Sequence, residues 1–260
     1  MTDYQRISPR GNNKVPAVTL VFWVIKLLST TVGETGADYL AVHVGLGTLA
    51  TDALMTGLLM VALLLQWTAR THVAWRYWLV VVLVSIVGTQ VTDFLTDELE
   101  ISLYLSTAAF SAVLAATFWV WQRIEGTLSV QTIFPGRREA FYWLAILFTF
   151  ALGTAAGDLA TEALQLGFRL GTVVFGGLIF ATWVGRRLGL DATLAFWIAY
   201  VLTRPLGASL GDFLSQARTY GGLGLGTVTT SAVFLATIIA LVAWIGRDKS
   251  SLQTTAAGAP

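Results

Sequence analysis

The chain has 260 residues, of which 55% are hydrophobic and 12% are charged, and its mean hydropathy is +0.71. A soluble domain carries about 25% charged residues, so this composition excludes a water-soluble globule and a disordered chain. The 16 basic residues nearly balance the 15 acidic ones, which argues against a nucleic-acid partner, and the absence of cysteine excludes disulfides and thiolate metal sites. We therefore expect an integral membrane protein whose main partner is the lipid bilayer.

Eight apolar segments are long enough to cross a membrane. A spanning helix needs about 20 apolar residues, and helices are the open elements that satisfy their own backbone hydrogen bonds in lipid. We therefore expect an all-α, polytopic protein with eight transmembrane helices in a single transmembrane domain, residues 1–260. The predicted spans are residues 16–40, 46–68, 77–96, 101–122, 141–161, 166–185, 192–214 and 222–246.

Lysine and arginine are distributed unequally between the two ends of these spans. At most Arg169 and Arg218 lie on one side, whereas the side that carries both tails, residues 1–15 and 247–260, holds the other basic loop residues. Basic loops stay in the cytoplasm, so we expect both termini there and a bacterial inner membrane as the location. The basic residues on this side are Arg6, Arg10, Lys14, Arg70, Arg76, Arg123, Arg137, Arg138, Arg186, Arg187, Arg247 and Lys249.

A pattern of three residue types recurs four times along the chain. Tryptophan is followed after nine intervening residues by glycine, and after four more by aspartate. Each copy includes two spans, so we expect four parallel two-helix repeats around a pseudo-symmetry axis, with the four aspartates at one depth. The repeats are residues 16–68 with Trp23, Gly33 and Asp38; 77–122 with Trp78, Gly88 and Asp93; 141–185 with Trp143, Gly153 and Asp158; and 192–246 with Trp197, Gly207 and Asp212.

This pattern resembles an uncharacterised family of bacterial membrane proteins built from four copies of a two-helix repeat, each with a tryptophan. The resemblance covers nearly the whole chain. It implies eight transmembrane helices, and it implies no activity.

Ionisable side chains lie within the predicted spans, where they are costly. An acid at the centre of a spanning helix costs about 2.5–3.5 kcal/mol on insertion scales, so these groups must be paired, protonated, hydrated or bound to a cation. We therefore expect an inward-facing polar cavity that holds positive charge. The acids are Glu34, Asp38, Asp52, Asp93, Asp158 and Asp212, and the bases are Lys26 and Arg204.

The first repeat differs from the others in carrying two extra acids. Glu34 and Asp38 are four residues apart and share a helix face, and Asp52 comes from the second helix of the same repeat, which we expect to face the first. Oxygen-rich sites suit hard cations such as Mg²⁺, Mn²⁺, Ca²⁺ and Na⁺. We expect these three acids to be the ligands, the later aspartates to complete or gate the site, and Lys26 and Arg204 to act as counter-charges or gates. Supporting oxygens come from Thr107, Thr172 and Thr227, which occupy the position of Asp52 in the other repeats.

Several repeated residues also have a purely structural interpretation. Glycine followed after three residues by a small residue is typical of close helix packing in membranes, so we expect this role for the four repeat glycines, Gly33, Gly88, Gly153 and Gly207. The tryptophans are expected to anchor the helices at the membrane interface. Each aspartate could simply bond the threonine of its own repeat.

The leading hypothesis is secondary transport of a hard cation, with Mn²⁺ or Mg²⁺ favoured, proton coupling as an option, and export slightly favoured over import. No catalytic motif occurs, so we expect no enzyme activity and no cofactor other than a bound cation. Two alternatives remain open: a scaffold or accessory protein without transport activity, and a carrier of a small organic anion held by Lys26 or Arg204.

Overall fold

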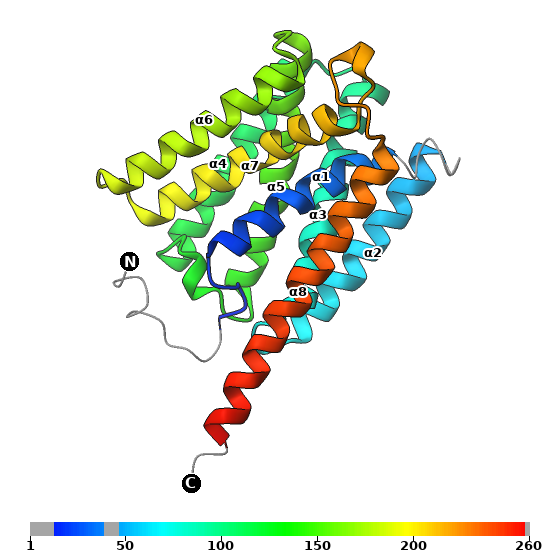
Figure 1. The fold of residues 1–260 in the computed structure, drawn as a ribbon. Coiled ribbons are helices and arrows are strands. Elements are labelled where there is room, and N and C mark those ends of the chain that lie inside the picture. Colours follow the sequence, from blue (N-terminus) through cyan, green and yellow to red (C-terminus); the bar gives the residue numbers. More distant parts are fainter. Residues whose placement is uncertain (1–12, 39–46, 258–260) are drawn as a thin grey trace.

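The computed structural model describes residues 13–38 and 47–257, with side chains described for residues 13–33 and 47–247. The described chain is all-α, as the sequence predicted, and contains eight α-helices (Figure 1). They are α1 (Leu20–Asp38), α2 (Thr48–Thr68), α3 (Ala74–Asp93), α4 (Leu103–Glu125), α5 (Arg137–Asp158), α6 (Gly167–Arg187), α7 (Ala192–Ser215) and α8 (Thr227–Ala257).

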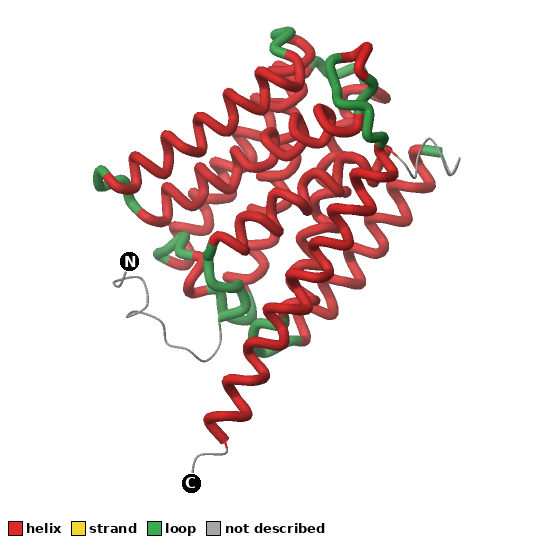
Figure 2. The backbone as a smooth tube through the Cα atoms, in the orientation of Figure 1, coloured by secondary structure: helices red, strands yellow, loops and turns green. Residues whose placement is uncertain are grey.

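Six of the described helices are long and apolar enough to cross a membrane, so the protein is a multi-pass membrane protein. They are α2, α3, α4, α5, α6 and α8, and two of them are extended by π-helical turns: η2 (Phe94–Glu98) follows α3, and η4 (Leu159–Ala163) follows α5. Two short 3₁₀ helices, η3 (Val130–Thr132) and η5 (Arg218–Tyr220), lie in the connections (Figure 2).

Local chemistry accounts for the ends of several helices. Asp191 accepts hydrogen bonds from the backbone N–H groups of Thr193 and Leu194, both at 2.9 Å, and so caps the start of α7. Ser102 caps α4 in the same way, and Gly126 ends α4 with a φ of 71°, a conformation that suits glycine.

The first helices of the four repeats form a closed ring. Helix α1 packs on α3, α3 on α5, α5 on α7, and α7 returns to α1. The second helices lie outside this ring, with α2 on α3, α4 on α5, α6 on α7, and α8 on α1. The expectation that the two helices of one repeat face each other is therefore wrong, because each outer helix packs mainly on the inner helix of the next repeat.

Glycines bring neighbouring inner helices into close contact. A Cβ atom added at any repeat glycine would lie within 3.0 Å of a side chain on the next inner helix, and that side chain always belongs to the residue three positions before the next repeat glycine. The same contact thus recurs at each of the four junctions of the ring. The pairs are Gly33 with Ser85, Gly88 with Phe150, Gly153 with Arg204, and Gly207 with Thr30.

The repeat tryptophans lie in an aromatic cluster inside the bundle. Trp78, Trp143 and Trp197 are buried, and the Trp197 indole donates a hydrogen bond to the Leu128 carbonyl at 3.0 Å. Trp23 is half-buried and packs against the Phe196 ring, with 5.5 Å between the centroids. The expectation of interfacial anchors is therefore corrected, since these rings are buried or half-buried and pack mainly on other aromatic side chains of the bundle.

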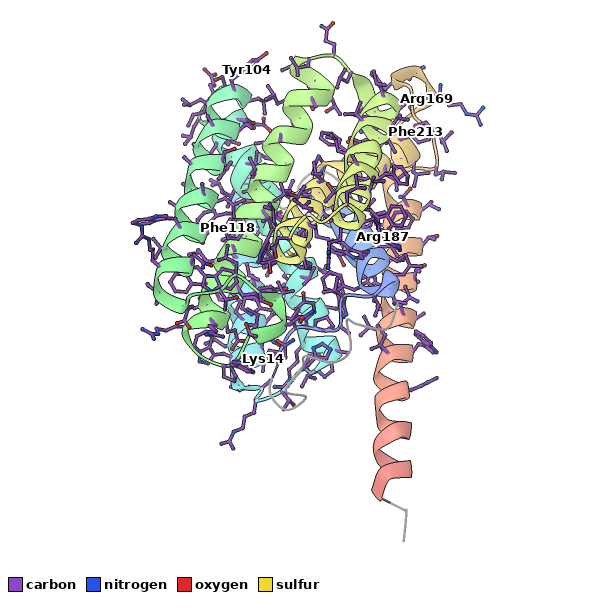
Figure 3. The ribbon with its side chains drawn as sticks, turned by 90° about the vertical axis from the view of Figure 1, so that its left-hand side faces the viewer. Lys14, Tyr104, Phe118, Arg169, Arg187 and Phe213 are labelled. Atoms are coloured by element: carbon purple, nitrogen blue, oxygen red, sulfur yellow. The ribbon has the colours of Figure 1, made fainter. Side chains whose placement is uncertain are left out.

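A buried ion pair lies at the end of the ring where the described chain begins. Lys14 Nζ lies 2.6 Å from Glu139 Oε2 and donates to the Gln66 carbonyl at 2.7 Å, and both charged side chains are 1% exposed. The Lys14 backbone N–H also donates to the Ile133 carbonyl at 2.9 Å. Lys14 therefore belongs to the packed bundle and not to a solvated tail over residues 1–15, and Figure 3 shows it at this end.

Candidate functional site

Lys26 of α1 lies in the interior of the ring. Its side chain is 0% exposed, and Nζ donates to the Tyr200 carbonyl of α7 at 3.0 Å. The ammonium also lies over two aromatic rings, 4.5 Å from the centroid of Phe150 and 4.3 Å from that of Tyr200. These contacts spread its charge over α5 and α7 by cation–π attraction and one carbonyl dipole.

Arg204 of α7, the neighbour of α1 in the ring, enters the same interior. It is 0% exposed, its Cβ lies against Gly153 of α5, and Nη2 donates to the Thr89 hydroxyl of α3. The guanidinium also lies close enough to Lys26 for the two positive charges to repel each other. Side chains from all four inner helices therefore meet around two buried cations.

Hydroxyl and amide groups are also buried on the inner helices. In the described part of the chain, four buried hydroxyl or amide oxygens on α3 and α7 have no hydrogen-bond partner. Buried polar groups are normally satisfied, so unused donors and acceptors here are free for water or a solute. The four atoms are Ser85 Oγ, Gln90 Oε1, Tyr200 Oη and Ser209 Oγ.

Three of the predicted acids lie near the ends of inner helices. Asp93 is the last residue of α3 and Asp158 the last of α5, and each directly precedes a π-helical turn. Asp212 lies three residues before the end of α7, which closes without such a turn. All three side chains are half-buried. The repeat thus places these carboxylates at one end of the ring, although each comes from a different helix.

The predicted cluster in the first repeat falls largely outside the described side chains. Glu34 and Asp38 lie on the last turns of α1, but their side chains are among those not described. Asp52 of α2 is half-buried and interacts electrostatically with Glu98 of η2. Among the described side chains, no three of His, Cys, Asp or Glu gather closely enough to hold a metal ion. A cation site of three acids therefore includes at least one acid whose side chain is not described, as the predicted set does with Glu34 and Asp38.

The supporting threonines follow the packing of the outer helices. Thr107, Thr172 and Thr227 are half-buried on α4, α6 and α8, which pack on α5, α7 and α1 respectively. Next to Thr172, a Cβ at Gly171 would lie 2.9 Å from Ser209 Oγ, three residues before Asp212. The start of α6 near Thr172 thus meets α7 of the following repeat and also η4 of its own, since the same added Cβ would lie 3.0 Å from Thr161.

The contact between the start of α6 and the end of α7 supports the same pairing. The Arg169 guanidinium lies 5.6 Å from the centroid of the Phe213 ring. Figure 3 shows both residues at the end of the bundle opposite Lys14. Phe213 directly follows Asp212. The charged end of α7 is therefore covered by the outer helix of the third repeat.

Two features of the site were missed by reasoning from the sequence. The π-helical turns after Asp93 and Asp158 were not predicted, although a second acid follows each aspartate at the fourth position, as Asp97 and Glu162. The Lys14–Glu139 pair joins residues 125 positions apart, and no local pattern indicates it. Lys26 and Arg204, by contrast, are indicated by the sequence, because charge is rare in apolar segments.

Residues 21–72, 76–127, 141–187 and 195–250 match DUF347, a repeat of unknown function. No curated protein and no solved structure matches the chain. Each of the four matched segments contains one inner and one outer helix, and together they cover most of the sequence. The chain therefore belongs to the DUF347 family and carries four copies of its repeat.

Proposed function

We propose that this protein is a membrane transporter for a small hard cation, and that the path runs through the ring of α1, α3, α5 and α7. In this proposal all eight helices cross a bacterial inner membrane as four parallel repeats, with both termini in the cytoplasm. The preferred substrate is a divalent ion such as Mn²⁺ or Mg²⁺, bound by Glu34, Asp38 and Asp52. The later aspartates, Asp93, Asp158 and Asp212, complete or gate the site.

The observation that carries the proposal is the burial of Lys26 and Arg204 together in the ring interior, both 0% exposed. Charges removed from water are tolerated inside a membrane protein when opposite charge or a polar cavity compensates them. Each of these cations is followed eight residues later on its own helix by an acid, Glu34 and Asp212 respectively. The ring thus combines buried positive charge with repeated negative charge near one end.

This arrangement suits exchange between internal and external cations. When no ion is present, Lys26 and Arg204 balance the carboxylates through the low-dielectric interior, where charges interact strongly. An incoming cation takes over this role and repels the two side chains, because like charges then share the site. Loading and unloading can therefore alternate with movement of these side chains or with protonation of the acids.

A second candidate is a carrier of a small organic anion. The described contacts of Lys26 are a carbonyl and two aromatic rings, with no carboxylate among them. Together with Arg204 and the unpartnered hydroxyls, it offers donors suited to a carboxylate or phosphate group. This candidate uses the same ring interior with the roles of substrate and counter-charge reversed.

Flux measurements in liposomes separate these functions. In the cation proposal, Glu34→Gln or Asp38→Asn abolishes Mn²⁺ or Mg²⁺ flux while the protein stays folded, and Asp191→Asn, at an exposed helix cap, leaves flux intact. An anion carrier instead loses flux with Lys26→Gln or Arg204→Gln and ignores metals. A scaffold shows no flux of either kind, and its Asp38→Asn variant loses only thermal stability.

A thermal titration gives an independent answer. A ligand that binds only the folded state raises the melting temperature as its concentration rises. The cation proposal requires such a rise with MnCl₂, MgCl₂, CaCl₂ or NaCl, and its disappearance in Asp38→Asn. If none of the four salts raises the melting temperature beyond a matched choline chloride control, hard-cation binding is contradicted.

A further inference from the structure

An apolar groove runs along the outside of the bundle between α3 and α8. Its volume is about 840 Å³, within the range of about 300–1,000 Å³ typical of small-molecule sites. Its walls are mainly aliphatic and aromatic, and Trp75 at its rim is 51% exposed. Residues that form the walls include Trp75, Trp78, Leu79, Val82, Ile239 and Val242.

The groove has a polar, basic end. Thr71 and His72 line it just before α3 begins, and Gly246 lines it on α8. The neighbouring residues in the chain, Arg70 and Arg247, are both exposed. Asp248 comes next in the sequence, so the local positive charge is partly offset, but Lys249 follows it. An apolar groove that ends near Arg70 and Arg247 matches the amphipathic shape of a lipid with a negatively charged head group.

One buried donor lies in the groove wall at an intermediate depth. Trp78 is 2% exposed, and its indole N–H has no hydrogen-bond partner in the described part of the chain. Buried tryptophan N–H groups usually find an acceptor. Trp78 lies four residues into α3, or about 6 Å below its start. An ester carbonyl of a membrane lipid, which lies just below its phosphate, is an acceptor at this depth.

We propose that this groove is a binding site for one anionic phospholipid of the surrounding bilayer. The acyl chains lie along Leu79, Val82 and Ile239, an ester carbonyl accepts a hydrogen bond from Trp78, and the phosphate head lies between Arg70 and Arg247. Basic pockets between membrane helices are known to hold anionic head groups. The proposal rests on the membrane location of the helices and does not depend on cation transport.

Native mass spectrometry of the delipidated, full-length protein tests this assignment. The probes are phosphatidylglycerol and phosphatidylcholine with identical acyl chains, titrated separately. We expect one phosphatidylglycerol to bind about ten-fold more tightly than phosphatidylcholine. Arg70→Gln combined with Arg247→Gln removes this preference, whereas Ile239→Trp fills the groove and abolishes binding of both lipids.

A conservative pair of variants tests the hydrogen bond itself. Trp78→Phe keeps an aromatic ring but removes the N–H donor, and we expect it to weaken binding of both lipids several-fold. Trp119→Phe, at a 62% exposed position on α4, is the matched control and leaves binding unchanged. Melting temperatures without lipid show whether each variant is folded.

Three results would overturn the proposal. The first is equal binding of the two lipids that no groove variant alters, which indicates ordinary boundary lipid. The second is a stable dimer that Ile239→Trp disrupts, which assigns the groove to a second copy of the chain. The third is loss of lipid binding in Trp119→Phe to the same extent as in Trp78→Phe.

Discussion

The inner and outer helices of this protein are built for different surroundings. Within an 18-residue apolar stretch of each candidate span, 56% of the residues are buried in α3 and 61% in α5. The corresponding share is 22% in α2 and α4 and 11% in α6 and α8. The inner helices carry most of the buried hydroxyls together with the buried Lys26 and Arg204, whereas the outer helices present Leu, Val, Phe and Trp to the lipid. The repeat therefore combines one helix for the interior with one for the bilayer.

Hydropathy alone detects the inner helices α3 and α5 as well as the outer ones, but it does not detect the inner helix α7. Helix α7 is 24 residues long but is absent from the six candidate spans, because it contains Arg204, Asp212 and many small or polar residues. A helix enclosed by other helices does not need a lipid-compatible surface. The inner helix α7 can therefore carry buried charge at the cost of a lower hydropathy.

The largest effect on stability is expected where charge is most deeply buried. Lys14→Met leaves Glu139 buried without its ammonium partner, and breaking a buried pair costs about 3–5 kcal/mol. The exposed pair is the matched control: Arg137 is 78% exposed, so Arg137→Gln should change stability by less than about 1 kcal/mol. Unfolding free energies from denaturant titrations in mixed micelles measure both.

The double variant Lys14→Met/Glu139→Leu distinguishes pairing from simple packing. Removing both charges avoids the lone buried carboxylate, so the double variant should recover much of the stability that Lys14→Met loses. If the double variant is as unstable as the sum of its two single variants, the Lys14–Glu139 pair does not act as a unit.

The next largest effect comes from the close contacts of the inner ring. Gly88→Ala places a methyl group within 3.0 Å of Phe150, and Gly153→Ala one within 3.0 Å of Arg204. Overpacking of this kind costs about 1–3 kcal/mol. Gly57 and Gly177 on the outer helices have no atom within 4 Å of an added Cβ, so alanine there should stabilise by about 0.5–1 kcal/mol.

The same unfolding assay compares these four alanine variants directly. Opposite signs for the inner and outer glycines are the expected result. Loss of stability of similar size at Gly57 and Gly88 would show that helix propensity and ring packing are not the causes, and would remove the distinction between the two sets of helices.

The sequence predicted the positions of the helices better than it predicted which helices pack against each other. Apolar length and the spacing of Trp, Gly and Asp are local signals, and they predicted eight helical segments in four repeats. Which helices pack together depends on how distant parts of the chain fit one another. Nothing in the spacing indicated that α8 packs on α1, at the other end of the chain. Tryptophan was also ambiguous, because its ring suits both a membrane interface and a buried aromatic cluster such as that of Trp78 and Trp143.

The candidate site was predictable to a similar degree. Lys26 and Arg204 stood out because isolated charge is costly in an apolar segment, and the structure buries both in the ring interior. The position of Asp52 beside Glu98 was not foreseen, because it depends on α2 packing against the second repeat. Sequence can thus identify which groups are unusual, whereas the packing of the outer helices decides which groups they meet.

A smaller effect is expected from the hydroxyl pair inside the aromatic cluster. Tyr77 and Tyr142 are buried on neighbouring inner helices, and their hydroxyl oxygens are 2.6 Å apart. Tyr77→Phe leaves the buried Tyr142 hydroxyl without this partner and should cost about 1–3 kcal/mol. Tyr77→Phe/Tyr142→Phe should cost less than twice as much, as a double-mutant cycle in the same micelles will show.

The smallest effect is expected where an outer helix meets lipid. Leu64 of α2 is 64% exposed, so Leu64→Ala exchanges one apolar surface in lipid for another and should change the unfolding free energy by less than about 0.5 kcal/mol. Ile146 of α5 is 0% exposed, and Ile146→Ala leaves a cavity that costs about 2–5 kcal/mol. Because lipid tails are as apolar as leucine, the contrast between these variants measures packing rather than transfer from water. Equal losses at the two positions would mean that Leu64 is covered in the membrane, by a lipid held in place or by a second copy of the chain, and that the outer helices are not simply a lipid-facing layer.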